Sequence, residues 1–172
     1  MATVVPPKLK KGDEIRVITP SRSIKLKFIS KEMVDNGIKN LENLGLKVTF
    51  GKHVEEIDDF NSSSIKSRIS DLHDAFSDKN VKAIITVIGG YNSNQLLEYI
   101  NYELIRENPK ILVGYSDITA LQNAIYTKTG LITYSGPHFS LEIILCSLDD
   151  HSVEPLDGFT LNGLLSNKHF TK

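Results

Sequence analysis

Residues 83–94 read AIITVIGGYNSN, and this stretch decides the class of fold. From Ala83 to Ile88 the run is apolar except for Thr86, and Gly89-Gly90 breaks it. An apolar run of this length is typical of a central strand that is buried on both faces. We therefore predict a central strand of a parallel sheet, followed by a tight loop.

Strand-like and helix-like segments alternate on both sides of this stretch, from Glu14 to Gly136. Such alternation favours an α/β fold with a mostly parallel sheet and helices on both faces. A helix capped by Ser93 is also expected after the central strand. The predicted strands are 14–19, 46–50, 83–88, 111–113 and 131–135, and the other predicted helices are 28–44, 65–76, 102–106 and 117–128.

The composition is that of a globular domain, with 40% apolar and 24% charged residues among 172. Lys and Arg number 20 against 21 Asp and Glu, and the net charge of −1 argues against a nucleic-acid partner. Residues 1–12 contain no continuous apolar stretch, so we expect neither a signal peptide nor a membrane span there. The single Cys146 cannot form an internal disulfide, which suits the cytoplasm.

Three loops follow predicted strands and are expected to converge on one rim of the sheet. They are Pro20–Ser23, Gly89–Asn94 and Gly114–Asp117. In an open α/β sheet, reactive groups collect beyond the carboxyl ends of the strands. Ser116 lies there between a buried strand and a helix, where a turn would expose its hydroxyl.

The local pattern leaves two interpretations of Ser116 open. Gly114 stands two residues before it but Ile118 stands two after, so the G-x-S-x-G motif of serine nucleophiles is only half met. Ser116 or Asp117 could instead simply cap the following helix. Gly89-Gly90 could bring an amide close to a ligand or form a plain turn. No dinucleotide-binding or P-loop spacing is present.

A serine nucleophile needs a base, normally a histidine. His138 follows the last predicted strand and could reach the rim, although the pattern favours an ordinary hydrogen-bonded loop histidine over a base. His53 and His73 are expected to be solvated surface residues. An alternative base is His138 or His151, oriented by Glu142 or Asp150, whereas His169 lies in sequence that we cannot place. No metal-ligand spacing occurs, so we expect no metal.

Four separated segments carry a resemblance to a known family. They are Gly12–Ile18 with Pro20-Ser21, Gly89–Ser93, Gly114–Leu121 and Tyr134–Pro137. In this order they resemble the LD-carboxypeptidases, and most closely the microcin C self-immunity branch of that family. The similarity extends from about Leu9 to Ser140.

The resemblance implies a flavodoxin- or Rossmann-like nucleophile domain without a cofactor. Ser116 would be the nucleophile, and the backbone amides of Gly90 and Asp117 would form the oxyanion hole. The family cleaves the amide between an L-residue and a D-amino acid in murein peptides, or a related bond in microcin-type toxins. We therefore expect a small peptide substrate and no membrane partner, and leave a homodimer open. Candidates for substrate binding are Ser21, Tyr91, Asn92 and Tyr115.

Members of this family are about twice this size and take a catalytic glutamate and histidine from a C-terminal domain. We therefore expect residues 1–140 to be the nucleophile domain and residues 141–172 to be a divergent or truncated tail without a second domain. Alone, the chain should be weakly active or inactive. Two other interpretations remain, a non-catalytic module that binds a peptide or nucleotide, and a truncated remnant with an exposed apolar interface.

Overall fold

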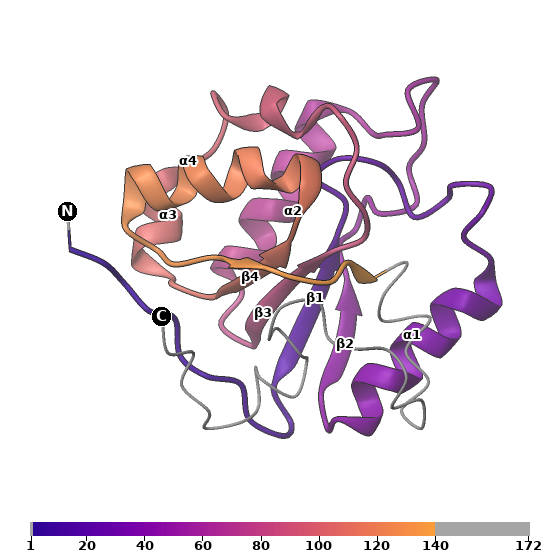
Figure 1. Ribbon diagram of the computed structural model, residues 1–172, viewed down its shortest axis with the longest axis horizontal. Coiled ribbons are helices and arrows are strands. Elements are labelled where there is room, and N and C mark those ends of the chain that lie inside the picture. Colours follow the sequence, from indigo (N-terminus) through magenta and orange to yellow (C-terminus); the bar gives the residue numbers. More distant parts are fainter. Residues whose placement is uncertain (1, 140–172) are drawn as a thin grey trace.

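The computed structural model describes residues 2–139, in which five strands form one sheet in the order β2-β1-β3-β4-β5 (Figure 1). Every pairing in this sheet is parallel. The order is that of a flavodoxin-like doubly wound fold, which confirms the predicted α/β class. The strands are β1 (Glu14–Ile18), β2 (Lys47–Phe50), β3 (Val81–Thr86), β4 (Ile111–Gly114) and β5 (Tyr134–Ser135).

Helices cover both faces of the sheet: α1 packs on one face, and α2, α3 and α4 pack on the other (Figure 1). Two short 3₁₀ turns lie at the carboxyl edge of the strands. The helices are α1 (Lys31–Asn43), α2 (Ile65–Ser77), α3 (Tyr102–Glu107) and α4 (Thr119–Thr129), and the turns are η1 (Ser93–Leu96) and η2 (Ser116–Ile118).

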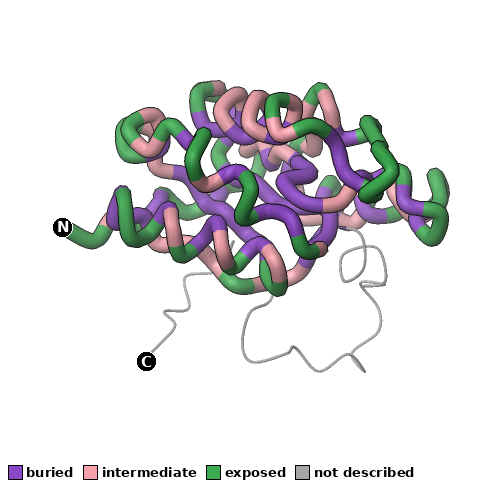
Figure 2. The backbone as a smooth tube through the Cα atoms, turned by 90° about the horizontal axis from the view of Figure 1, so that it is seen from above, coloured by how far each residue is buried: buried purple, intermediate pink, exposed green. Residues whose placement is uncertain are grey.

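The continuous apolar run of β3 serves two cores. Ala83 and Ile85 belong to the core under α1, together with Leu41 of that helix. Ile84 points to the other face and joins the core that contains Phe76 of α2. Successive side chains of a strand point to opposite faces, so a central strand must be apolar at every position. Figure 2 shows the result, with buried strands in the middle and exposed residues on loops and outer helix faces.

Side-chain caps and one left-handed residue fix the helix ends. The Ser30 hydroxyl accepts the Met33 N–H at 3.1 Å, and the Ser64 hydroxyl accepts the Ser67 N–H at 3.0 Å. Such caps contribute about 1 kcal/mol each. Gly130 ends α4 with a φ of 78°, in the left-handed region that favours glycine.

Four predicted elements have boundaries that differ from the structure by two or three residues. Helix α4 begins at Thr119 and not at Asp117, because the turn η2 precedes it. Helix α1 begins at Lys31 and not near residue 28, because Ser30 caps it. Strand β3 is Val81–Thr86 and not 83–88, since its partner β1 ends before Pro20, which has no N–H for further pairing. The predicted strand 131–135 shrinks to β5, and Leu131 forms only an isolated bridge with Val4.

The predictions for residues 141–172, including those for Glu142, Cys146, Asp150, His151 and His169, lie outside the described residues. Within residues 2–139, no helix has the length and apolar character needed to cross a membrane.

Candidate active site

Loops from three strands meet at the carboxyl edge of the sheet, as the sequence predicts. The order of the strands reverses between β1 and β3, and ligands of doubly wound folds bind at such a point. The Ser21 hydroxyl, after β1, donates to Asp117 Oδ2 at 2.7 Å, and the Asn92 N–H, after β3, donates to the same oxygen at 3.1 Å. These contacts join segments that lie up to 96 residues apart in the chain.

The Asp117 carboxylate is the common partner of these loops. Besides Ser21 and Asn92, the Ser93 N–H donates to Oδ2 at 3.0 Å, and the Ser93 hydroxyl donates to the Asp117 carbonyl oxygen at 2.7 Å. Hydrogen bonds to a carboxylate are roughly twice as strong as those between neutral groups. The predicted capping role of Ser93 is wrong, because η1 begins after Asn92 without a side-chain cap.

Ser116 has a backbone conformation that side-chain-bearing residues rarely adopt. Its φ is 59°, in the left-handed region, and among the described non-glycine residues only Asn61 shares a positive φ. Such strain costs on the order of 1–3 kcal/mol and clusters at functional sites. Neither η2 nor α4 has a side-chain cap hydrogen bond, so capping does not explain Ser116. The residue is exposed on a sharp strand-to-helix turn, where serine nucleophiles lie.

Two glycines leave room for this turn. A Cβ on Gly89 would lie 3.2 Å from Ser116 Cβ and 3.3 Å from Ser116 Oγ, so the loop after β3 passes directly against the serine. A Cβ on Gly114 would overlap with Thr86 Oγ1 and lie 3.0 Å from Ile118 Cγ2. Of the two glycines in the G-x-S-x-G motif, the chain thus has Gly114, on which the turn depends. Ile118 stands in place of the second glycine and packs against Gly114.

Of the two amides expected to form an oxyanion hole, that of Asp117 lies beside Ser116. The Asp117 nitrogen lies 3.5 Å from the Cβ position of Gly89, close to the serine. Arg22 Nε donates to the Gly89 carbonyl oxygen at 3.1 Å, which fixes the peptide plane between Gly89 and Gly90. Because the carbonyl and N–H of a trans peptide point in opposite directions, the Gly90 N–H points away from Arg22. The oxyanion role of both amides stays a prediction.

His138 lies beside the turn that carries Ser116. Its ring centroid is 4.4 Å from that of Tyr115, and its Nδ1 is 2.9 Å from Thr86 Oγ1. The Thr86 hydroxyl also lies 3.3 Å from the Val113 carbonyl oxygen, which fixes this side of the ring to the ends of β3 and β4. The side chain is 1% exposed. A role as base stays a prediction.

The other two described histidines differ from each other. His53 is near the surface, and its Nδ1 lies 2.7 Å from Glu56 Oε1. His73 is half-buried, and its Nε2 accepts the Asn101 N–H at 2.9 Å, so its side chain is less solvated than expected. Burial lowers the pKa of His73, although Asp74 opposes this.

The four substrate-binding candidates divide by burial. Ser21 and Asn92 are buried and belong to the network around Asp117. Tyr91 is 64% exposed and Tyr115 is 37% exposed, so their rings are accessible at the rim. The Tyr91 hydroxyl donates to the Phe60 carbonyl oxygen at 3.0 Å, which ties Tyr91 to the loop that precedes α2. Contacts with a substrate stay predictions.

Arg68 of α2 is a site-organising residue that the sequence reasoning missed. It is 3% exposed, and its Nη1 donates to the carbonyl oxygens of Pro20 at 3.3 Å and Asn92 at 3.0 Å. Its Nη2 donates to Gln95 Oε1 at 2.7 Å. Burial lowers the pKa of the guanidinium, and the nearby carboxylates of Asp58 and Asp117 raise it. The sequence did contain a signal for this role, because Arg68 lies among the apolar residues of the predicted helix 65–76.

Within residues 2–139, no group of three or more His, Cys, Asp or Glu side chains is arranged to hold a metal ion.

A family model described as the LD-carboxypeptidase N-terminal domain matches residues 15–136, which is more than half of the chain. The chain belongs to the LD-carboxypeptidase family. This LD-carboxypeptidase chain is 57% identical over 142 residues to the putative carboxypeptidase YocD of Bacillus subtilis, covering 83% of the chain and 43% of YocD. A probable murein peptide carboxypeptidase of the same organism is 37% identical over 166 residues, 96% of the chain and 49% of that protein. The latter alignment therefore continues past Ser140.

Solved structures agree with this assignment. The LD-carboxypeptidase chain is 62% identical to an MccF-like protein from Bacillus anthracis, with a TM-score of 0.80 over 84% of the chain and 43% of that protein. The microcin C7 self-immunity protein MccF in complex with adenosine monophosphate is 34% identical, with a TM-score of 0.78 over 84% of the chain and 42% of that protein. The chain spans less than half the length of these relatives.

Proposed function

We propose that this chain supplies the nucleophile of a serine-type LD-carboxypeptidase, with Ser116 attacking the L–D amide of a murein peptide or the related bond of a microcin-type conjugate. The observation that carries the proposal is the exposed, left-handed Ser116 at the end of β4, directly against Gly89. Relatives named murein peptide carboxypeptidase and MccF support the two substrate classes.

In this mechanism, Ser116 Oγ forms a bond to the amide carbonyl carbon while its proton passes to a base. The carbonyl oxygen becomes an oxyanion, which the N–H groups of Gly90 and Asp117 stabilise. Collapse of this intermediate breaks the C–N bond, and the amine of the D-amino acid leaves with a proton. Water then hydrolyses the ester on Ser116. The carboxylate of Asp117 does not react but holds the loops that bear both amides.

The proposal assigns the nucleophile domain to residues 1–140 and leaves the base open. His138 is the nearest histidine described, and the resemblance implies a histidine and glutamate from a C-terminal domain. If no base is present, the chain alone should retain only the part of catalysis that an oxyanion hole and binding provide, about 10³–10⁴-fold over water in serine proteases.

Labelling with a fluorophosphonate, read by intact-mass spectrometry of the full chain, tests this function. We expect one adduct on the wild type, none on Ser116→Ala, and one on Ser135→Ala, which removes another exposed serine at the same edge of the sheet. The loss of label in Ser116→Ala alone would support activation of this serine. A folded wild type without any adduct would contradict an activated nucleophile in this chain.

A second candidate is ligand binding without turnover. The similarity to MccF in complex with adenosine monophosphate favours it. Titration with this nucleotide distinguishes the two, because binding by both the wild type and Ser116→Ala, combined with no adduct on either, would favour a binding module.

A further inference from the structure

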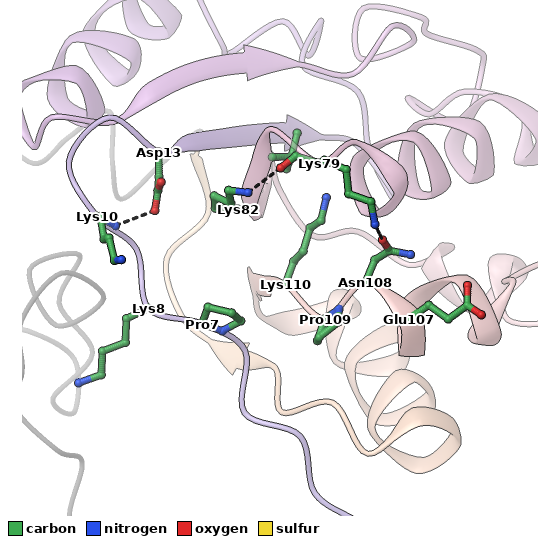
Figure 3. Close-up of a pocket in the computed structure, with 11 residues that line it drawn as sticks. Pro7, Lys8, Lys10, Asp13, Lys79, Lys82, Glu107, Asn108, Pro109 and Lys110 are labelled. Atoms are coloured by element: carbon green, nitrogen blue, oxygen red, sulfur yellow. Dashed lines mark hydrogen bonds between the residues drawn. The ribbon is translucent and has the colours of Figure 1, made fainter.

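A cavity of about 330 Å³ lies at the edge of the sheet opposite to Ser116 (Figure 3). Its walls come from the segment before β1 and from the turns that lead into β3 and β4. In a parallel sheet these are the amino ends of the strands, whereas Ser116 follows the carboxyl end of β4. We call it the lysine pocket. Its lining residues are Pro7, Lys8, Lys10, Asp13, Lys79, Val81, Lys82, Glu107, Asn108, Pro109 and Lys110.

Positive charge dominates this pocket, which five lysines and two acidic residues line. The Asp13 carboxylate accepts the Lys10 N–H at 2.7 Å. The Glu107 carboxylate points away from the lysines (Figure 3). The side chains of Lys79, Lys82 and Lys110 lie along one wall in the same view. The Lys79 ammonium donates to Asn108 Oδ1 and the Lys82 ammonium to the Lys79 carbonyl oxygen, and since an ammonium has three donors, each keeps further N–H groups for an anion. The pocket therefore presents positive charge to a small molecule that enters it.

Lys110 forms the buried end of this wall. It is 6% exposed, and its Nζ donates to the carbonyl oxygens of Ala75, at 2.9 Å, and Asp78. Burial, opposed by the charge of Asp78 and aided by those of Lys82, Lys79 and Arg16, lowers the pKa of Lys110 to about 8. The Asp78 carboxylate is itself paired with Arg16 at 2.9 Å. An anion in the pocket would offset the mutual repulsion of these cations.

The residue types indicate the class of anion. All cations on the lining are lysines, whose ammonium groups act as point charges and suit compact phosphate oxygens, whereas arginine suits planar carboxylates. Pro7, Val81 and Pro109 add apolar surface beside them. The volume is at the lower end of ligand pockets, which span roughly 300–1,000 Å³. We propose that the lysine pocket binds a small phosphorylated metabolite through its phosphate groups.

Calorimetric titration of the full chain with inorganic pyrophosphate tests this proposal. We expect binding that weakens at high salt. The double variant Lys79→Gln and Lys82→Gln should bind about tenfold or more weakly, because it removes two ammonium groups that would donate charge-assisted hydrogen bonds to phosphate oxygens. The matched control Lys39→Gln, on the exposed face of α1, should bind as the wild type does.

Both replaced lysines are exposed, so thermal unfolding of the double variant should match that of the wild type and exclude a folding defect. Three results would overturn the proposal: no heat at millimolar pyrophosphate, equal affinity of the double variant and the wild type, or citrate binding as tightly as pyrophosphate. None of these results bears on labelling of Ser116, since the two sites lie at opposite ends of the strands.

Discussion

At Ser116 the backbone adopts a φ of 59°, which a glycine would adopt at lower cost. The same left-handed φ occurs at Asn61, but asparagine tolerates this region because its short polar side chain bonds locally. The fold alone would favour glycine at this position, and a serine there is what the proposed role of Ser116 as nucleophile requires. The strain is thus a property of the site and not of the sheet.

Replacement of Ser116 by glycine should therefore stabilise the protein relative to Ser116→Ala. Relief of left-handed strain is worth about 1–2 kcal/mol, and the greater freedom of glycine in the unfolded chain offsets about 0.4–1 kcal/mol of it. We expect a net gain of about 0.5–1 kcal/mol in urea denaturation. The control Asn61→Gly should gain less stability than Ser116→Gly does. Equal stability of the glycine and alanine variants would show that Ser116 is not strained.

At the scale of elements, helix α2 fixes the loops at the carboxyl edge of the sheet. Arg68 projects from this helix and donates to backbone carbonyl groups after β1 and after β3. These two loops carry Ser21 and Asn92, which in turn hold the Asp117 carboxylate. A helix that packs on one face of the sheet thereby fixes loops at its edge.

The conservative change Arg68→Lys should loosen these loops. A lysine ammonium cannot reproduce the forked geometry with which Arg68 contacts Pro20, Asn92 and Gln95. We expect fluorophosphonate labelling of Ser116 to slow about tenfold, the equivalent of roughly 1.4 kcal/mol. The control is Lys66→Gln, an exposed position on the same helix, which should label at the wild-type rate. Unchanged labelling in Arg68→Lys would remove Arg68 from the positioning of the site.

The sequence correctly predicted those elements that depend on residues close together in the chain. The apolar run of β3 acts within a few residues, and the structure contains this central strand. Strand β5 was overestimated because its length depends on pairing with β4 at Val113 and Gly114, which no local signal reveals. The roles of Arg68 and Ser93 were missed for the same reason, since their partners are distant in the chain.

At the scale of the whole molecule, the two edges of the sheet differ in chemistry. The carboxyl edge bears Ser116 and a network built around one carboxylate. The amino edge bears the lysine pocket, where burial holds the pKa of Lys110 at about 8. The convergence of loops at the first edge follows from the α/β class and could be predicted. The cluster at the second edge depends on side chains from three separated segments and could not.

The depressed pKa of Lys110 predicts how the stability of the protein changes with pH. In the unfolded chain its pKa is near 10.5, so between pH 8 and 10.5 the unfolded state holds a proton that the folded state has released. The unfolded state therefore binds more protons, and the contribution of Lys110 makes folding more favourable as pH rises through this window.

Urea denaturation at pH 8, 9 and 10 checks this dependence. The stability of the wild type should rise relative to that of Lys110→Met across the series, because methionine has no proton to lose. The control Lys39→Met should keep a constant difference from the wild type. A constant difference for Lys110→Met as well would mean that Lys110 titrates alike in both states.

The hydrogen bond between Ser21 and Asp117 also has a consequence for the order of folding. It closes a loop of 96 residues, and contacts of such high sequence separation form after local helices and turns. During translation at about 5–20 residues per second, the ribosome needs roughly 5–20 s to add Asp117 after Ser21. Throughout that interval the loops after β1 and β3 lack the carboxylate that joins them. Strands β1, β2 and β3 are thus synthesised before the carboxylate that joins the loops after β1 and β3.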